Sequence, residues 1–63
     1  MSISSQVFLT EAEAAEYLRV SRSYLRKARG KGEGPPYRKL GGRIIRYRIE
    51  DLDAWADENT IIT

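Results

Sequence analysis

The chemistry-bearing residues of this sequence are concentrated in residues 21–32, SRSYLRKARGKG, where five of twelve side chains are Arg or Lys and none is acidic. On a helix, Arg22 and Arg26 lie one turn apart on one face, where like charges weaken an isolated helix by about 0.2–0.5 kcal/mol per pair. A bound polyanion would remove that repulsion. Arginine also donates two hydrogen bonds to guanine O6 and N7 in the major groove of B-DNA, which admits one α-helix. Taken alone, this face fits a nucleic-acid reader and an ordinary solvated helix surface equally well.

The charges of the chain are segregated along the sequence. Residues 19–48 carry all eleven basic side chains and one acidic side chain, a net charge of +10, whereas residues 1–18 carry −3 and residues 49–63 carry −5. The overall charge of +2 hides this division. A basic middle between acidic ends is typical of a surface that binds a polyanion, although mutual neutralisation of the ends and the middle would leave the same pattern.

Two short helices joined by a tight turn must position the basic face. Thr10 is the predicted N-cap of the first helix, and Glu13 completes a T-x-x-E capping box. The segment RVS interrupts that helix. Ser21 is a second N-cap, and the next helix is expected to run over residues 22–29 and to stop at Gly30. A short helix, a tight turn and a second helix form a helix-turn-helix pattern.

A basic β-hairpin is predicted after the second helix. The loop GKGEGPPY follows a helix and leads into Pro-Pro, which is the wrong context for a dinucleotide-binding glycine motif. Beyond it, two β-prone runs flank Gly41-Gly42, a signal for a two-residue hairpin turn. Ile45 and Tyr47 share one face of the second strand. After a helix-turn-helix, such a hairpin is interpreted as a wing.

A third helix, IEDLDAWADEN, closes the predicted fold. Its apolar stripe includes Leu52 and Trp55, and Trp55 is expected to be the main core anchor. Arg48 stands where a capping Ser or Asp is expected, so we predict that the start of this helix frays. The fold class is mainly α with a two-stranded β-hairpin wing, a winged helix-turn-helix. The expected core comprises Leu18, Val20, Leu25, Leu40, Ile45, Tyr47, Leu52 and Trp55.

The composition excludes several classes of function. The chain has no Cys and no His, so disulfides are impossible and a zinc site lacks its usual ligands. The segment DLDAW begins like a calcium loop, but Trp55 occupies the third ligand position. The carboxylates lie at predicted helix starts or on solvated faces, where capping and solubility explain them. We therefore predict no enzymatic activity, no metal and no cofactor.

The chain length predicts a single domain. We expect a flexible N-terminus over residues 1–6, a winged helix-turn-helix over 7–58 and a C-terminal tail over 59–63. No segment has the apolar length of a membrane span or of a signal peptide. We therefore expect no membrane association and a cytoplasmic location.

Three segments carry a resemblance to a known family: LTEAEAAEYLRVSRSYL, GPPYRKLGGRIIRYR and EDLDAW. Together they run from Leu9 to about Trp55, and the chain resembles the small winged-helix DNA-binding proteins of the excisionase and AlpA-like regulator group, relatives of the MerR-type DNA-binding domain. The family usually has glycine where this chain has Arg19. The resemblance implies that the second helix enters the major groove and that the wing tip at Gly42 and Arg43 touches the backbone or the minor groove.

The predicted DNA-contacting residues fall into three groups. The recognition helix contributes Ser21, Arg22, Ser23, Tyr24, Arg26 and Lys27. The wing and its loop contribute Arg38, Lys39, Gly42, Arg43 and Arg46. Further contacts with the DNA backbone are expected from Thr10, Arg19, Arg29, Lys31 and Arg48.

The combination of turn, basic helix and basic hairpin favours a sequence-specific double-stranded DNA-binding protein. The resemblance implies a phage or mobile-element setting, as an excisionase-like recombination directionality factor or a transcriptional regulator, with attachment-site or operator DNA and an integrase as partners. We expect a monomer in solution that binds cooperatively along nucleoid DNA. The alternative is a protein-interaction module whose basic face binds an acidic protein. The role of the apolar pair Ile61-Ile62 is left open.

Overall fold

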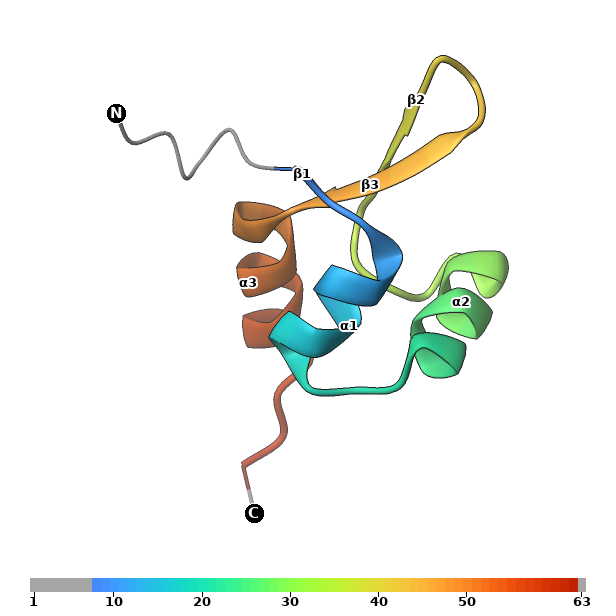
Figure 1. Ribbon diagram of the computed structural model, residues 1–63. Coiled ribbons are helices and arrows are strands. Elements are labelled where there is room, and N and C mark those ends of the chain that lie inside the picture. Colours follow the sequence, from blue (N-terminus) through green and yellow to red (C-terminus); the bar gives the residue numbers. More distant parts are fainter. Residues whose placement is uncertain (1–7, 63) are drawn as a thin grey trace.

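The computed structural model describes residues 8–62, which form three helices and a small antiparallel sheet (Figure 1). The predicted flexible segment, residues 1–6, lies outside the described residues. The winged helix-turn-helix expected from the sequence is confirmed. In chain order the elements are β1 (Phe8–Leu9), α1 (Glu11–Leu18), α2 (Arg22–Lys31), β2 (Arg38–Leu40), β3 (Ile44–Arg48) and α3 (Ile49–Glu58).

Helix α1 begins at the predicted capping box. The Thr10 hydroxyl oxygen accepts a hydrogen bond from the Glu13 backbone N–H at 3.1 Å, and Glu13 Oε1 accepts one from the Thr10 N–H at 2.9 Å. Ala14 and Ala15 are buried, and their small side chains let neighbouring elements approach closely. As a result α1 lies at the centre of the fold, between α2 and α3 (Figure 1).

The turn between α1 and α2 holds Arg19 in a left-handed backbone conformation, with φ 61° and ψ 43°. Its N–H donates to the Glu16 carbonyl at 3.1 Å, and the Val20 N–H donates to the Ala15 carbonyl at 2.9 Å. These two bonds form the Schellman arrangement that usually ends on glycine. Within residues 8–62, Arg19 is the only residue other than glycine with a positive φ. Such a conformation costs a side-chain-bearing residue about 1–2 kcal/mol.

Helix α2 starts as predicted but ends later. The Ser21 hydroxyl oxygen accepts a hydrogen bond from the Tyr24 N–H at 3.0 Å, which confirms the second N-cap. The prediction that Gly30 stops the helix is wrong, because α2 continues to Lys31 and ends at Gly32, with φ 71°. A glycine inside a helix costs only about 1 kcal/mol relative to alanine, so Gly30 is tolerated there. The left-handed conformation that terminates the helix falls two residues later.

The sheet has the order β1-β3-β2, with β3 paired on both sides. Strand β1 was not expected from the sequence and turns the predicted two-stranded hairpin into a three-stranded sheet. It pairs Phe8 with Arg48 and Leu9 with Tyr47. A two-residue strand is too short to show alternation in the sequence, so only its pairing with β3 reveals it.

The hairpin loop is one residue longer than predicted. Gly41 and Gly42 have φ values of 61° and 81°, and the Arg43 N–H donates to the Leu40 carbonyl at 3.2 Å, so the expected glycine turn is present. However, Leu40 pairs with Ile44, which leaves Arg43 unpaired as a third loop residue. This register places Leu40 on the same face as Ile44, away from the face that carries Tyr47, because directly paired residues share a face.

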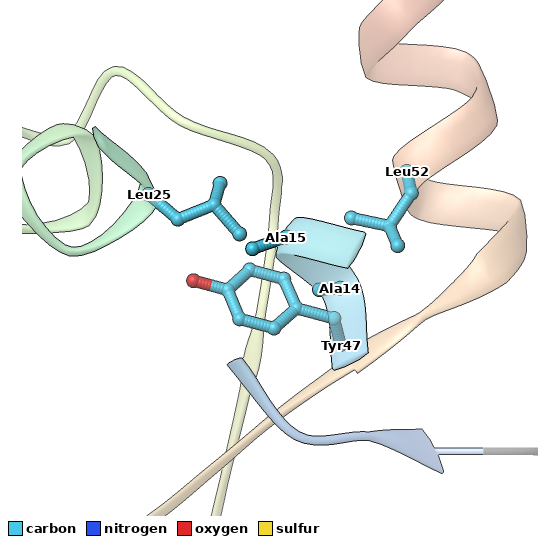
Figure 2. Close-up of a cluster of buried hydrophobic side chains, with 5 residues drawn as sticks. All are labelled: Ala14, Ala15, Leu25, Tyr47 and Leu52. Atoms are coloured by element: carbon cyan, nitrogen blue, oxygen red, sulfur yellow. The ribbon is translucent and has the colours of Figure 1, made fainter. Parts of the chain in front are cut away.

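The buried core consists of Ala14, Ala15, Leu25, Tyr47 and Leu52 (Figure 2). The predictions for Leu25, Tyr47 and Leu52 are confirmed, and Leu18 and Ile45 pack against this cluster from its edge.

Three predicted core positions are corrected. Leu40 is 39% exposed because of the hairpin register described above, and Val20 is 36% exposed because it lies in the turn after α1. Trp55 is only partly buried, and its indole N–H donates to the Glu33 carbonyl at 3.3 Å. The largest fully buried side chain is instead that of Tyr47, which β3 places between α2 and α3 (Figure 2).

Helix α3 follows β3 without a connecting loop. Arg48 is its N-cap residue and makes no side-chain cap hydrogen bond, and the predicted fraying of this helix start stays a prediction. The Arg48 guanidinium instead donates to Glu50 Oε2 at 2.8 Å. The buried residue of the helix is Leu52, which joins α3 to the core. Because β3 runs directly into α3, the core fixes one end of the hairpin while the other end projects from the domain (Figure 1).

Candidate nucleic-acid interface

Helix α2 presents the predicted recognition residues to solvent. Leu25 and Ala28 are buried, so the helical period turns Arg22, Ser23 and Arg26 outward, where all three are exposed. The Arg26 side chain is 61% exposed. The Schellman arrangement at Gly32 and the Ser21 cap fix the two ends of the helix. The exposed arginines therefore stand on a rigid support.

The remaining predicted residues of α2 lie beside this face. Tyr24 is 49% exposed, and Lys27 is exposed. Ser21 is exposed, but its hydroxyl oxygen already accepts the capping hydrogen bond, which leaves its O–H free to donate.

An open groove of about 800 Å³ runs along one side of α2, between this helix and α3. Val20, Tyr24 and Trp55 contribute its apolar lining, while Lys27 and Lys31 contribute charge. This groove was not predictable from the sequence, because residues from all three helices line it. Its presence accounts for the partial exposure of the aromatic side chains on this side of the molecule.

The wing carries a second group of basic residues. Every residue of β2 is exposed, and Arg38 pairs directly with Arg46 across the hairpin. Like charges at such a position repel each other. One guanidinium nitrogen of Arg46 donates to the Ile45 carbonyl at 2.8 Å. Lys39 lies opposite Ile45 on the other face of the hairpin.

The tip of the wing is narrow. Arg43 is exposed, and a Cβ atom added at Gly41 or Gly42 would meet nothing within 4 Å. The tip therefore has space around it on the side of the glycines. Such a shape is compatible with close approach to a nucleic-acid backbone or to a narrow groove.

The five residues predicted to contact the DNA backbone divide into two sets. Arg19 and Lys31 are exposed, and neither makes a side-chain hydrogen bond or ion pair among residues 8–62. The other three have intramolecular roles: Thr10 caps α1, the Arg29 Nε donates to Glu11 at 3.0 Å, and Arg48 pairs with Glu50. Arg29 and Arg48 retain only 27% and 25% side-chain exposure. All five DNA contacts stay predictions.

The structure adds one residue that the sequence did not single out. Glu11 Oε2 accepts hydrogen bonds from Arg29 Nε at 3.0 Å and from the Tyr47 hydroxyl at 3.4 Å, and its other oxygen lies 3.9 Å from Arg26 Nε. Burial raises the pKa of Tyr47, and the nearby carboxylate charge raises it further. The hydrogen bond to Glu11 raises the pKa of Arg29. In the sequence Glu11 is indistinguishable from the other acidic residues of a first helical turn.

Helix α2 and the tip of the β2–β3 hairpin lie on the side of α1 that faces away from α3 (Figure 1). Within residues 8–62 there is no cluster of His, Cys, Asp and Glu side chains arranged to hold a metal ion. The helices in this part of the chain are too short and too polar to cross a membrane. What the exposed surface offers is two sets of guanidinium and ammonium groups, whose natural ligand is a polyanion.

Comparison with known families gives an independent result. The model of a family described as "Helix-turn-helix domain" matches residues 8–60, which include every described helix and strand. No curated protein matches the chain. The matched family includes small DNA-binding proteins of the excisionase and AlpA-like type, and its helix-turn-helix indicates DNA binding. The family model covers most of the chain, and the observed fold is the one that such a match implies. This protein therefore belongs to the helix-turn-helix domain family.

Proposed function

We propose that this protein is a sequence-specific double-stranded DNA-binding protein in which α2 enters the major groove and the wing contacts the backbone or the minor groove. The observation that carries the proposal is the arrangement of α2. Its exposed face combines Arg22, Ser23 and Arg26, while its buried face is anchored by Leu25 and Ala28. A helix held in this way presents hydrogen-bond donors in fixed positions, which base recognition requires.

Within this proposal the residues of α2 have distinct roles. Arg22 and Arg26 donate hydrogen bonds to base edges, for which guanine O6 and N7 are the best acceptors. Ser23, in the first turn of the helix, binds a base or a phosphate. Ser21, Tyr24 and Lys27 flank this face and contact the backbone.

The wing supplies contacts that depend little on sequence. Arg43, next to Gly42 at the tip, meets a phosphate or a narrow minor groove, where the negative potential attracts arginine. Arg38 and Arg46 repel each other in the free protein, and a phosphate between them would relieve that repulsion. Lys39 adds charge on the opposite face. Arg19 and Lys31 extend the phosphate contacts around α2.

The resemblance to excisionases and AlpA-like regulators supports a more specific role. We infer a phage or mobile-element protein that acts without catalysis, either as a recombination directionality factor or as a transcriptional regulator. Its DNA is then an attachment site or an operator in the cytoplasm, bound within the nucleoid, and an integrase is a partner of the first role. A single small module buries only about 600–1,000 Å² of its surface on DNA, so we expect a monomer that gains affinity from neighbours bound along the duplex.

Titration against two duplexes tests the proposal. One duplex carries the genomic sequence adjoining the coding region, and the other is a scrambled duplex of equal composition. We expect tighter binding to the first duplex. Five to seven phosphate contacts would also give a slope of log affinity against log salt of about −4.5 to −6.

The same titration distinguishes the alternative function. Equal affinity for the two duplexes together with a slope near zero would contradict DNA recognition. That result would favour a module whose basic face binds an acidic protein.

A further inference from the structure

Glu11 lies where three elements of the fold meet. It is the first residue of α1, and its side chain is only 15% exposed. Its carboxylate accepts hydrogen bonds from Arg29 on α2 and from the hydroxyl of Tyr47 on β3. A single side chain of α1 therefore contacts both the helix that carries the recognition residues and the strand that carries the wing.

Aromatic contacts surround the same junction. The guanidinium carbon of Arg29 lies 5.9 Å from the centroid of the Tyr37 ring, a distance at which cation–π attraction operates. The Tyr37 and Tyr47 rings are tilted at 53° with their centroids 6.3 Å apart. Tyr37 belongs to the segment that leads from α2 into β2. Arg29 is thus held between the Glu11 carboxylate and an aromatic ring, and both of these neighbours also contact Tyr47 of β3.

The charge of Glu11 argues against a direct role in binding DNA. Its Oε1 lies 3.9 Å from Arg26 Nε, on the side of α2 that is proposed to meet DNA, where a carboxylate repels phosphate. A partly buried carboxylate is also costly unless hydrogen-bond donors satisfy it. Here Arg29 and Tyr47 provide those donors. These features point to a role in holding elements together.

We propose that Glu11 is a positioning residue for DNA binding, which fixes the angle between α2 and the wing so that both contact one duplex at the same time. This inference rests on the proposed function. Two contact surfaces strengthen each other only when their geometry allows simultaneous engagement. Without Glu11, α2 still presents Arg22 and Arg26, but the wing no longer reaches the DNA in a fixed register.

A double-mutant cycle between positions 11 and 43 tests this proposal. Arg43 is the exposed residue at the wing tip, whereas Glu11 lies at the junction with the core. Affinity for the cognate duplex is measured for the wild type, Glu11→Ala, Arg43→Ala and the double variant. We expect the factor by which Arg43→Ala weakens cognate binding to be at least about threefold smaller in the Glu11→Ala background than in the wild type. The reason is that the wing then contributes less to binding.

Glu16→Ala is the matched control. Glu16 lies on the same helix, is exposed, and makes no side-chain hydrogen bond or ion pair among residues 8–62, yet its removal changes the net charge by the same amount. In the Glu16→Ala background the loss caused by Arg43→Ala should equal the loss in the wild type. A thermal melt of each variant shows whether the protein is folded at the temperature at which its DNA affinity is measured.

Tyr47→Phe provides a second route if Glu11→Ala does not fold. It keeps the buried ring and removes only the hydroxyl that reaches Glu11. The loss caused by Arg43→Ala should again be smaller in this background than in the wild type. An unchanged loss in the folded Glu11→Ala variant, or in Tyr47→Phe when the former is unfolded, would overturn the positioning role. Failure of the wild type to discriminate between duplexes would instead overturn the proposed function itself.

Discussion

Helix α2 and the wing both expose several basic side chains, but the rest of the molecule holds them differently. In α2, Leu25 is fully buried, a serine caps the N-terminus and a glycine closes the C-terminus. In the wing, all of β2 is exposed and the tip has open space around its glycines. Reading base edges needs side chains placed within about 0.5 Å, whereas phosphate contacts tolerate adjustment. The difference supports the proposal that α2 reads the sequence while the wing adds affinity.

The two turns that bracket α2 show a related contrast. Both Arg19 and Gly32 adopt the left-handed conformation, and in both turns this residue and the next one donate their backbone N–H groups to carbonyls of the preceding helix. Glycine adopts this conformation without a steric cost, and arginine does not. Residues in strained backbone conformations often cluster at functional sites. Arg19 is exposed next to the N-terminus of α2, which fits a phosphate contact.

The largest expected effect is on the free energy of unfolding, in a comparison of Leu25, which anchors α2, with Leu40 in the wing. Leu25→Ala should lower the free energy of unfolding by about 2–5 kcal/mol, because it leaves a cavity in a core of few residues. Leu40→Ala should lower it by only about 0.5 kcal/mol, because Leu40 is 39% exposed. Urea unfolding followed by circular dichroism measures both values. Equal losses would show that the wing is as firmly packed as α2.

A smaller effect concerns the turns beside α2. Arg19→Gly should raise the free energy of unfolding by about 1 kcal/mol and should weaken DNA binding on cognate and scrambled duplexes alike. Gly32→Ala is the reciprocal variant. It should lower stability by about 1 kcal/mol through the backbone alone, since an added Cβ there meets nothing within 4 Å. A stabilised Arg19→Gly protein with unchanged DNA affinity would show that this arginine has no role in binding.

Local signals in the sequence were sufficient to predict most elements. The capping residues Thr10 and Ser21 mark both helix starts, and the alternation around Tyr47 identifies the buried face of β3. These features depend on neighbours a few residues away. The choice between Gly30 and Gly32 as the end of α2 was not predictable in this way, because both glycines are compatible with a helix end and tertiary structure decides between them.

Features that depend on distant residues were missed or misjudged. A loop longer by one residue moved Leu40 from the core face of the hairpin to its outer face, and no local pattern specifies that register. Trp55 was overestimated as an anchor because its place on the apolar stripe of α3 does not show that its ring lines the open groove beside α2. Glu11 contacts Arg29, which is 18 positions away in the sequence, and Tyr47, which is 36 positions away. These contacts are visible only in three dimensions.

The central claim is that α2 reads the sequence of DNA and the wing does not. The most direct measurement titrates Arg22→Ala, Arg26→Ala and Arg43→Ala against the cognate and the scrambled duplex at two salt concentrations. Arg22→Ala and Arg26→Ala should each lose about 1–3 kcal/mol of binding free energy on the cognate duplex and much less on the scrambled one. Arg43→Ala should weaken both duplexes similarly and reduce the salt slope by about one. Equal losses on the two duplexes for Arg22→Ala and Arg26→Ala would contradict the assignment of α2 as the recognition helix.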